Sequence, residues 1–154
     1  MVATRKAYGE TIAEMGGKFN DIIVLDADIS KSTYSCLFAE KYPKRFINVG
    51  VAEQNEMMIA AGIATTGKIP FVSTYSVFAS MRACEQVRTF ICYPKLNVKI
   101  AVSHGGVTPG SDGPTHQATE DNQERDCCSE RSSSHSNCIL WGDIEDKKSW
   151  TRSN

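Results

Sequence analysis

The stretch of residues 46–64 constrains the fold most, because it predicts a strand, a turn and a helix in direct succession. Residues 46–49 have the composition of a short strand, and Gly50 then gives the backbone the freedom to turn. A helix is expected from about Ala52, with apolar side chains along it at Met57, Met58, Ala60, Ala61 and Ile63. A strand that turns directly into a helix is typical of the βαβ units of a parallel sheet.

The same alternation runs through the first two thirds of the chain. The runs that predict further strands are 22–25, 70–75 and 98–103. The periodic runs that predict further helices are 5–19, 37–41 and 79–92, with residues 30–33 expected to form a polar loop. We therefore expect an α/β fold, a parallel sheet with helices on both faces.

Acidic residues follow two of the predicted strands. Asp26 and Asp28 come directly after residues 22–25, and Glu53 lies in the first turn of the helix after residues 46–49. Such residues commonly cap loops and helix starts, where free backbone N–H groups favour a carboxylate. Open α/β folds also bind ligands at this carboxyl edge of the sheet, so a binding role is the second interpretation.

Two further segments suggest a site. Tyr75, Phe78 and Met81 are spaced three apart, which indicates either core packing or one shared face, and the neighbouring Arg82 is interpreted as a surface or interface charge. Residues 103–117 form a long loop with four glycines, two prolines and two histidines. Long ordered loops are commonly functional, and histidines exchange protons near neutral pH.

Composition excludes several classes of protein. The chain has 154 residues, a formal net charge of −1 and 41% hydrophobic residues, which suits one globular domain and no nucleic-acid or membrane surface. With no signal-peptide pattern, we expect a cytoplasmic protein. The only cysteine-rich cluster has spacings that match no zinc pattern, so no metal site is expected at Cys127, Cys128, His135 and Cys138.

Residues 48–55, Asn-Val-Gly-Val-Ala-Glu-Gln-Asn, and residues 111–117, Ser-Asp-Gly-Pro-Thr-His-Gln, resemble motifs of the transketolase family of thiamine-diphosphate enzymes. The resemblance covers about residues 1–121. It implies the thiamine-diphosphate-binding fold, specifically the pyrimidine domain. It also implies that Glu53 hydrogen-bonds the ring nitrogen of the cofactor's aminopyrimidine, where it acts catalytically.

The resemblance implies further roles for named residues. Tyr75, Phe78 and Met81 match side chains around the pyrimidine, with Phe78 stacked on the ring, and Asp28 matches an aspartate near the cofactor and the subunit interface. His116 matches a histidine that transfers protons beside the cofactor. The residues that match sugar-phosphate-binding positions are Ser32, His104 and Asp112.

One family motif is missing from the chain. Transketolases hold the diphosphate and its Mg²⁺ with a Gly-Asp-Gly motif, which this sequence lacks. The resemblance therefore implies a C-terminal subunit that is active only with an N-terminal-section partner, in a homodimeric or heterotetrameric assembly. It would transfer a two-carbon ketol unit between sugar phosphates.

The resemblance ends after residue 121. Residues 122–154 are polar and serine-rich, and we expect a disordered or frameshifted tail and a fold that is incomplete at its C-terminal end. Two other functions stay open. One is a 1-deoxyxylulose-5-phosphate synthase-like subunit, and the other is a non-catalytic remnant that binds no cofactor.

Overall fold

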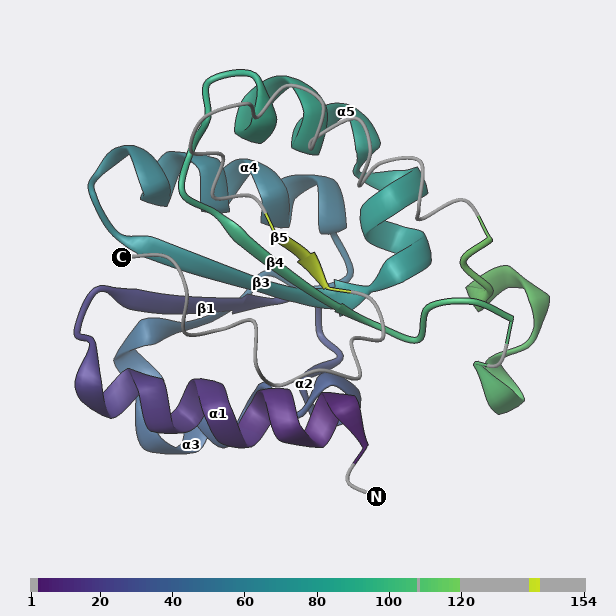
Figure 1. The fold of residues 1–154 in the computed structure, drawn as a ribbon, viewed down its shortest axis with the longest axis horizontal. Coiled ribbons are helices and arrows are strands. Elements are labelled where there is room, and N and C mark those ends of the chain that lie inside the picture. The colour runs from purple at the N-terminus through teal and green to yellow at the C-terminus, as the bar shows by residue number, and fades with distance from the viewer. Residues whose placement is uncertain (1–2, 108, 120–138, 142–154) are drawn as a thin grey trace.

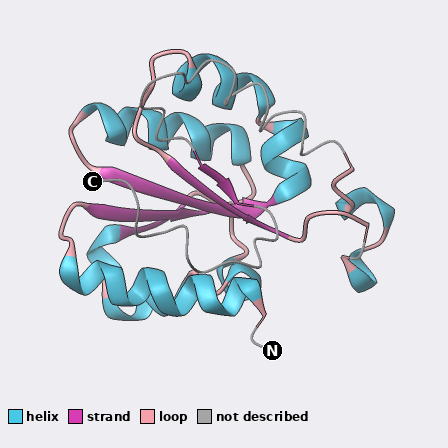
Figure 2. Ribbon diagram, in the orientation of Figure 1, coloured by secondary structure: helices cyan, strands magenta, loops and turns pink. Residues whose placement is uncertain are grey.

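A five-stranded parallel sheet lies at the centre of the computed structural model, which describes residues 3–107, 109–119 and 139–141 (Figures 1 and 2). The strand order is β2-β1-β3-β4-β5, and every neighbouring pair is parallel. The strands are β1 (Ile22–Asp26), β2 (Phe46–Asn48), β3 (Ile69–Tyr75), β4 (Lys99–Ser103) and β5 (Ile139–Trp141).

Helices cover both faces of the sheet. In Figure 1, α1 (Thr4–Lys18) and α3 (Cys36–Lys41) lie below it, and α4 (Glu53–Thr65) and α5 (Cys84–Gln86) lie above it. Short helical turns complete the layers: α2 (Ser30–Thr33), η1 (Pro43–Arg45), η2 (Phe78–Arg82), η3 (Val87–Cys92), η4 (Gly110–Asp112) and η5 (Pro114–His116). The predicted α/β fold with helices on both faces is confirmed.

Side chains that point to opposite faces of the sheet form two separate hydrophobic cores. On the α1 side, Ile12 and Phe38 pack with side chains from β1 and β3. On the α4 side, Met57 and Ile91 pack with Leu25 and other side chains from the sheet. Successive strand residues point to opposite faces, so a strand covered by helices on both sides must be apolar nearly throughout.

The strand order fixes where a ligand can approach. The chain passes from β1 to β2 on one side and then returns across the sheet to β3 on the other. Loops that leave neighbouring strands in opposite directions open a crevice at the carboxyl ends of the strands. The segments after β1, β3 and β4 all converge on this edge.

Two expected elements differ from the observed ones. Residues 30–33, expected as a loop, form the single helical turn α2. Residues 79–92, expected as one helix, are divided into η2, α5 and η3, and both η2 and η3 have π geometry. The wider turn of η2 is closed by a hydrogen bond from the Ala83 N–H to the Phe78 carbonyl, N···O 3.0 Å.

One strand lies late in the chain, beyond the predicted strands. β5 pairs with β4 in parallel, within the segment expected to be a tail. The rest of that segment, with Cys127, Cys128, His135 and Cys138, lies outside the described residues, and the domain boundary at residue 121 stays a prediction. Within the described parts, no helix has the length and apolar character needed to cross a membrane.

Candidate functional site

Glu53 is a buried carboxylate that lies at the start of a helix, at the carboxyl edge of the sheet. It is the first residue of α4, and only 2% of its surface is exposed. Nη1 of Arg82 lies 2.9 Å from each of its two carboxylate oxygens. Burial without a partner is costly for a carboxylate, and Arg82 and the start of α4 supply partners for Glu53.

Arg82 was not expected to contact Glu53. Its guanidinium carbon lies 4.1 Å from the centroid of the Phe78 ring, and its backbone carbonyl accepts a hydrogen bond from the Gln54 side chain, N···O 2.9 Å. Residues four positions apart in a helical turn lie close together, which places Arg82 next to Phe78. The contact with Glu53, 29 positions away, depends on how η2 packs against α4.

Four rings form a cluster beside this pair. Tyr75 and Phe78 stack with centroids 5.8 Å apart and an interplanar angle of 22°. The His104 ring lies 4.2 Å from the Tyr75 ring, and His116 presents its ring edge to Phe78 at 5.2 Å. β3, η2, β4 and the loop after β4 thus bring together four residues that the sequence singled out separately.

His104 connects the cluster to the N-terminal helix. Its backbone has a positive φ of 60°, its Nδ1 lies 2.8 Å from Ser103 Oγ, and its Nε2 lies 3.4 Å from Nη1 of Arg5. Arginine only donates, so Nε2 accepts and the proton lies on Nδ1. The same Arg5 nitrogen lies 3.5 Å from the Ser32 carbonyl. Arg5, which belongs to no sequence motif, lies between two residues predicted to bind a sugar phosphate.

The loop after β1 holds Asp28 at the same edge. Asp28 has a positive φ of 67°, and its Oδ1 accepts a hydrogen bond from the Asn48 side chain, N···O 2.8 Å. Asp26 is fully buried and accepts hydrogen bonds from the Ile29 N–H and the Thr33 and Ser35 hydroxyls, at 2.7–3.0 Å. Asp26 therefore shapes this loop, while Asp28 remains exposed.

Two predicted site residues lie apart from the cluster. Met81 is 59% exposed, because η2 turns it away from the Tyr75–Phe78 stack. Asp112 is exposed in η4, within the loop that carries His116. Their assigned roles stay predictions, and for Met81 the geometry gives no support.

Two more carboxyl groups lie beneath the site. Burial raises the pKa of Glu56 well above its usual value, and the nearby Asp26 and Glu53 raise it further, while the Ser73 backbone amide lowers it. Neither Glu56 oxygen meets hydrogen-bonding geometry with a described residue. Burial also raises the pKa of Asp26, against the lowering effect of its three hydrogen bonds.

No group of three or more His, Cys, Asp or Glu side chains within the described ranges could hold a metal ion. The donors that are present suit an organic ligand instead. They consist of one buried carboxylate, a face of stacked rings and two histidines.

The parallel sheet has a buried carboxylate and a cluster of aromatic rings at its carboxyl edge, beside the crevice where neighbouring connections diverge. This arrangement defines an α/β ligand-binding domain. The chain belongs to the transketolase family, because the family model described as the transketolase pyrimidine-binding domain matches residues 1–130. This confirms the resemblance drawn from the two motifs.

Individual relatives agree with this assignment. A putative transketolase C-terminal section from Methanocaldococcus jannaschii is 56% identical over 117 residues, covering 76% of this chain and 37% of the relative. Human transketolase is 43% identical over 121 residues, covering 78% of this chain and 19% of the relative. The chain therefore spans between a fifth and two fifths of the length of these relatives.

Solved structures show the same fold. A structure described as a split-gene transketolase, an inactive β4 tetramer, has a TM-score of 0.68 and 55% identity, covering 79% of this chain and 38% of that one. A transketolase from Campylobacter jejuni has a TM-score of 0.70 and 25% identity, covering 79% of this chain and 20% of that one.

Proposed function

We propose that the chain is the pyrimidine-binding section of a transketolase that transfers a two-carbon ketol unit between sugar phosphates and needs an N-terminal-section partner. The observation that carries the proposal is Glu53, a carboxylate that is 2% exposed at the start of α4 and at the carboxyl edge of the sheet. The relative named as a C-terminal section and the split-gene structure support a chain that works with a partner.

The residues present fit the aminopyrimidine part of thiamine diphosphate. Glu53 supplies an acid for a ring nitrogen, and Phe78 supplies an aromatic face for stacking. Both groups already bind a planar, nitrogen-bearing group in this structure, the guanidinium of Arg82. The chemistry of the two groups therefore suits such a ring.

Thiamine diphosphate, when bound, supplies the electron sink for cleaving a carbon–carbon bond of a ketose. The chain's own residues orient the reactants. In this proposal Glu53 fixes the ring nitrogen, His116 holds or moves a proton at its edge position beside Phe78, and Asp112 binds a sugar hydroxyl. His104 and Ser32 bind the sugar phosphate, and Arg5 between them adds a positive charge.

The diphosphate and Mg²⁺ need a second set of ligands. The sequence has no Gly-Asp-Gly motif, and a Mg²⁺–diphosphate site requires carboxylate and carbonyl oxygens next to the phosphates. We assign these ligands to the partner. The proposed assembly of the two subunits is either homodimeric or heterotetrameric. The cytoplasm remains our proposed location.

The experiment is a transketolase assay of the chain combined with an N-terminal-section subunit, with ribose 5-phosphate as the acceptor. We expect Glu53→Ala to lower kcat at least about a hundredfold, because a positioned acid is lost. Glu85→Ala changes an exposed glutamate of α5 and should leave kcat unchanged. Near-normal turnover of Glu53→Ala would remove Glu53 from the mechanism.

The same preparation separates the alternatives. Turnover of pyruvate with glyceraldehyde 3-phosphate, and none with ribose 5-phosphate, would indicate the synthase-like activity. Absence of turnover with either substrate pair, together with no binding of thiamine diphosphate, would indicate a non-catalytic remnant.

A further inference from the structure

Arg82 makes two contacts at once, and both involve groups that the proposed function needs free. Its Nη1 lies 2.9 Å from both oxygens of Glu53, and its guanidinium carbon lies 4.1 Å from the centroid of the Phe78 ring. Glu53 would otherwise receive the ring nitrogen of the cofactor, and Phe78 would otherwise stack on that ring. One side chain therefore occupies both positions.

The guanidinium resembles an aminopyrimidine in the properties that these two groups recognise. It is planar and delocalised, presents N–H donors in its plane, and stacks on aromatic faces. A carboxylate accepts hydrogen bonds from the edge of a guanidinium and shares one proton with a pyrimidine ring nitrogen, and an aromatic ring binds the face of either group. Glu53 and Phe78 thus select a kind of group that both Arg82 and an aminopyrimidine provide.

We propose that Arg82 is an internal occupant of the aminopyrimidine position, which must leave Glu53 and Phe78 before the cofactor can bind. The proposal rests on the proposed function of the same residues. It adds a self-blocking contact within the free chain, made by a residue of η2 next to the exposed Met81.

The exposure of the two partners makes this exchange selective. The side chain of Arg82 is 46% exposed, whereas that of Glu53 is 3% exposed. The guanidinium of Arg82 is already partly in contact with water, so Arg82 itself can move into solvent. Glu53 cannot, because a buried carboxylate without a partner is strongly unfavourable. Arg82 therefore leaves when another group takes over its contacts.

The hydrogen bond from the Gln54 side chain keeps the Arg82 backbone in place during the exchange, because it goes to the carbonyl and not to the guanidinium. Only the side chain needs to move. The affinity measured for a ligand is then the intrinsic affinity multiplied by the fraction of molecules in which Arg82 is displaced.

The test is calorimetric titration of the full chain with 4-amino-5-hydroxymethyl-2-methylpyrimidine. This compound carries the aminopyrimidine without the diphosphate, so it does not need the partner's ligands. We expect Arg82→Gln to bind it about tenfold more tightly than the unchanged chain, as when the competent fraction rises from about a tenth to nearly all. Arg88→Gln, the same change at an exposed position of η3, should bind like the unchanged chain.

Arg82→Lys provides a second variant that keeps the positive charge near Glu53 and so guards against misfolding. Lysine lacks the planar fork, so this variant should also bind more tightly than the unchanged chain. Equal or weaker binding by both Arg82 variants would overturn the proposal while leaving the aminopyrimidine site in place. No binding by any variant would overturn it together with the proposed function, and that result is distinct because the unchanged chain would also fail.

Discussion

At the scale of single residues, Glu56 is a carboxyl group that folding removes from water. Its side chain is fully buried, and burial raises its pKa well above the usual value of 4.5. The folded chain therefore holds a proton at Glu56 that the unfolded chain releases as the pH rises. By linkage, this contribution to stability is complete below about pH 4.5 and is lost as the pH rises toward the folded pKa.

We expect Glu56→Gln to flatten the decline of the free energy of unfolding with rising pH above about pH 4.5. The slope removed should approach 1.4 kcal/mol per pH unit, because one proton is involved. Urea denaturation at several pH values from 4.5 to 8 measures it. Some slope should remain, since the raised pKa of Asp26 acts in the same direction.

Glu40→Gln is the matched control, because Glu40 is exposed on α3 and the same atoms change. Its slope should equal that of the unchanged chain. An unaltered slope in Glu56→Gln would show that Glu56 is not the group that binds the proton.

At the scale of elements, the packing of α1 depends on two glycines. A Cβ on Gly9 would overlap the backbone and Cβ of Tyr34, and one on Gly16 would come within 2.5 Å of the Phe38 ring. The helix itself would favour alanine at both positions. The close approach of the chain after α2 therefore requires glycine at both positions, although helix propensity favours alanine.

Gly9→Ala should lower the free energy of unfolding by about 1–3 kcal/mol, because the added methyl overpacks this contact. Gly62→Ala should raise it by about 0.5–1 kcal/mol, because Gly62 lies in α4 with no atom within 4 Å of a new Cβ. Urea midpoints of the two variants measure the difference. Equal effects in the two helices would contradict the close contact at Gly9.

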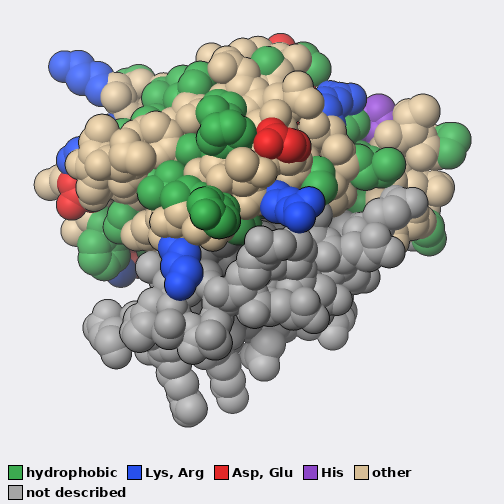
Figure 3. All heavy atoms as spheres, turned by 90° about the horizontal axis from the view of Figure 1, so that it is seen from above, with side chains coloured by type: hydrophobic (Ala, Val, Ile, Leu, Met, Phe, Trp, Pro, Cys, Tyr) green, Lys and Arg blue, Asp and Glu red, His purple; other side chains and the backbone are tan. Residues whose placement is uncertain are grey.

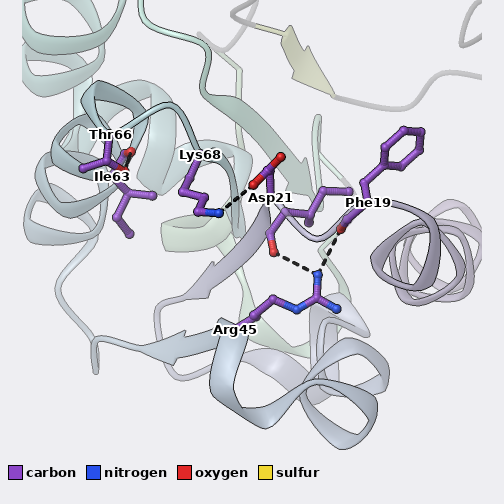
Figure 4. A network of polar contacts seen from close by, with 7 residues as sticks. Phe19, Asp21, Arg45, Ile63, Thr66 and Lys68 are labelled. Atoms are coloured by element: carbon purple, nitrogen blue, oxygen red, sulfur yellow. Dashed lines mark hydrogen bonds and ion pairs between the residues drawn. The ribbon is translucent and has the colours of Figure 1, made fainter.

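Arg45 joins the end of α1 to the start of β1, at the edge opposite the candidate site. Its guanidinium donates to the carbonyls of Gly16 at 2.7 Å and Phe19 at 3.0 Å, and lies 4.3 Å from the Tyr42 ring centroid. In Figure 4 it points at the Phe19 carbonyl, next to the ion pair of Lys68 with Asp21, N···O 2.6 Å.

Arg45→Lys should lower the free energy of unfolding by about 1–2 kcal/mol, since lysine cannot span both carbonyls or stack on Tyr42. Thermal unfolding measures the loss. Arg88→Lys makes the same change at an exposed position of η3 and should leave the transition unchanged. A loss of similar size in both variants would show that the contacts of Arg45 do not matter.

At the scale of the whole molecule, large apolar side chains remain exposed. Tyr93 is 76% exposed and Val51 is 73% exposed. Figure 3, seen from above, shows hydrophobic side chains spread over the face of the upper helices, with the histidine side chain toward one end. Apolar side chains spread over a surface in this way are common in folded proteins, so they do not by themselves identify an interface.

Thiamine diphosphate with Mg²⁺ should raise the free energy of unfolding of the complex with the N-terminal section by about 2.7 kcal/mol at a hundredfold excess over Kd. The chain alone should show a smaller effect, because we assign the diphosphate ligands to the partner. Thermal unfolding with and without the ligand measures both. The complex made with Glu53→Ala is the control, and a complex that shows no shift would favour the non-catalytic remnant.

The sequence by itself determined the first four strands, the main helices, their parallel arrangement and the position of Glu53 at a helix start, but not β5 (Ile139–Trp141). These follow from local patterns: buried strands are apolar throughout, helices repeat every three to four residues, and Gly50 allows the turn. The two motifs also pointed to the family before any contact was known.

Only the tertiary structure decided which side chains meet at the site. Arg5 and His104 are 99 positions apart, and packing of α1 against the sheet brings them to 3.4 Å. Packing of η2 against α4 leaves Met81 exposed and places Arg82 against Glu53 and Phe78. Such contacts depend on where separate elements pack, which a local sequence pattern does not specify.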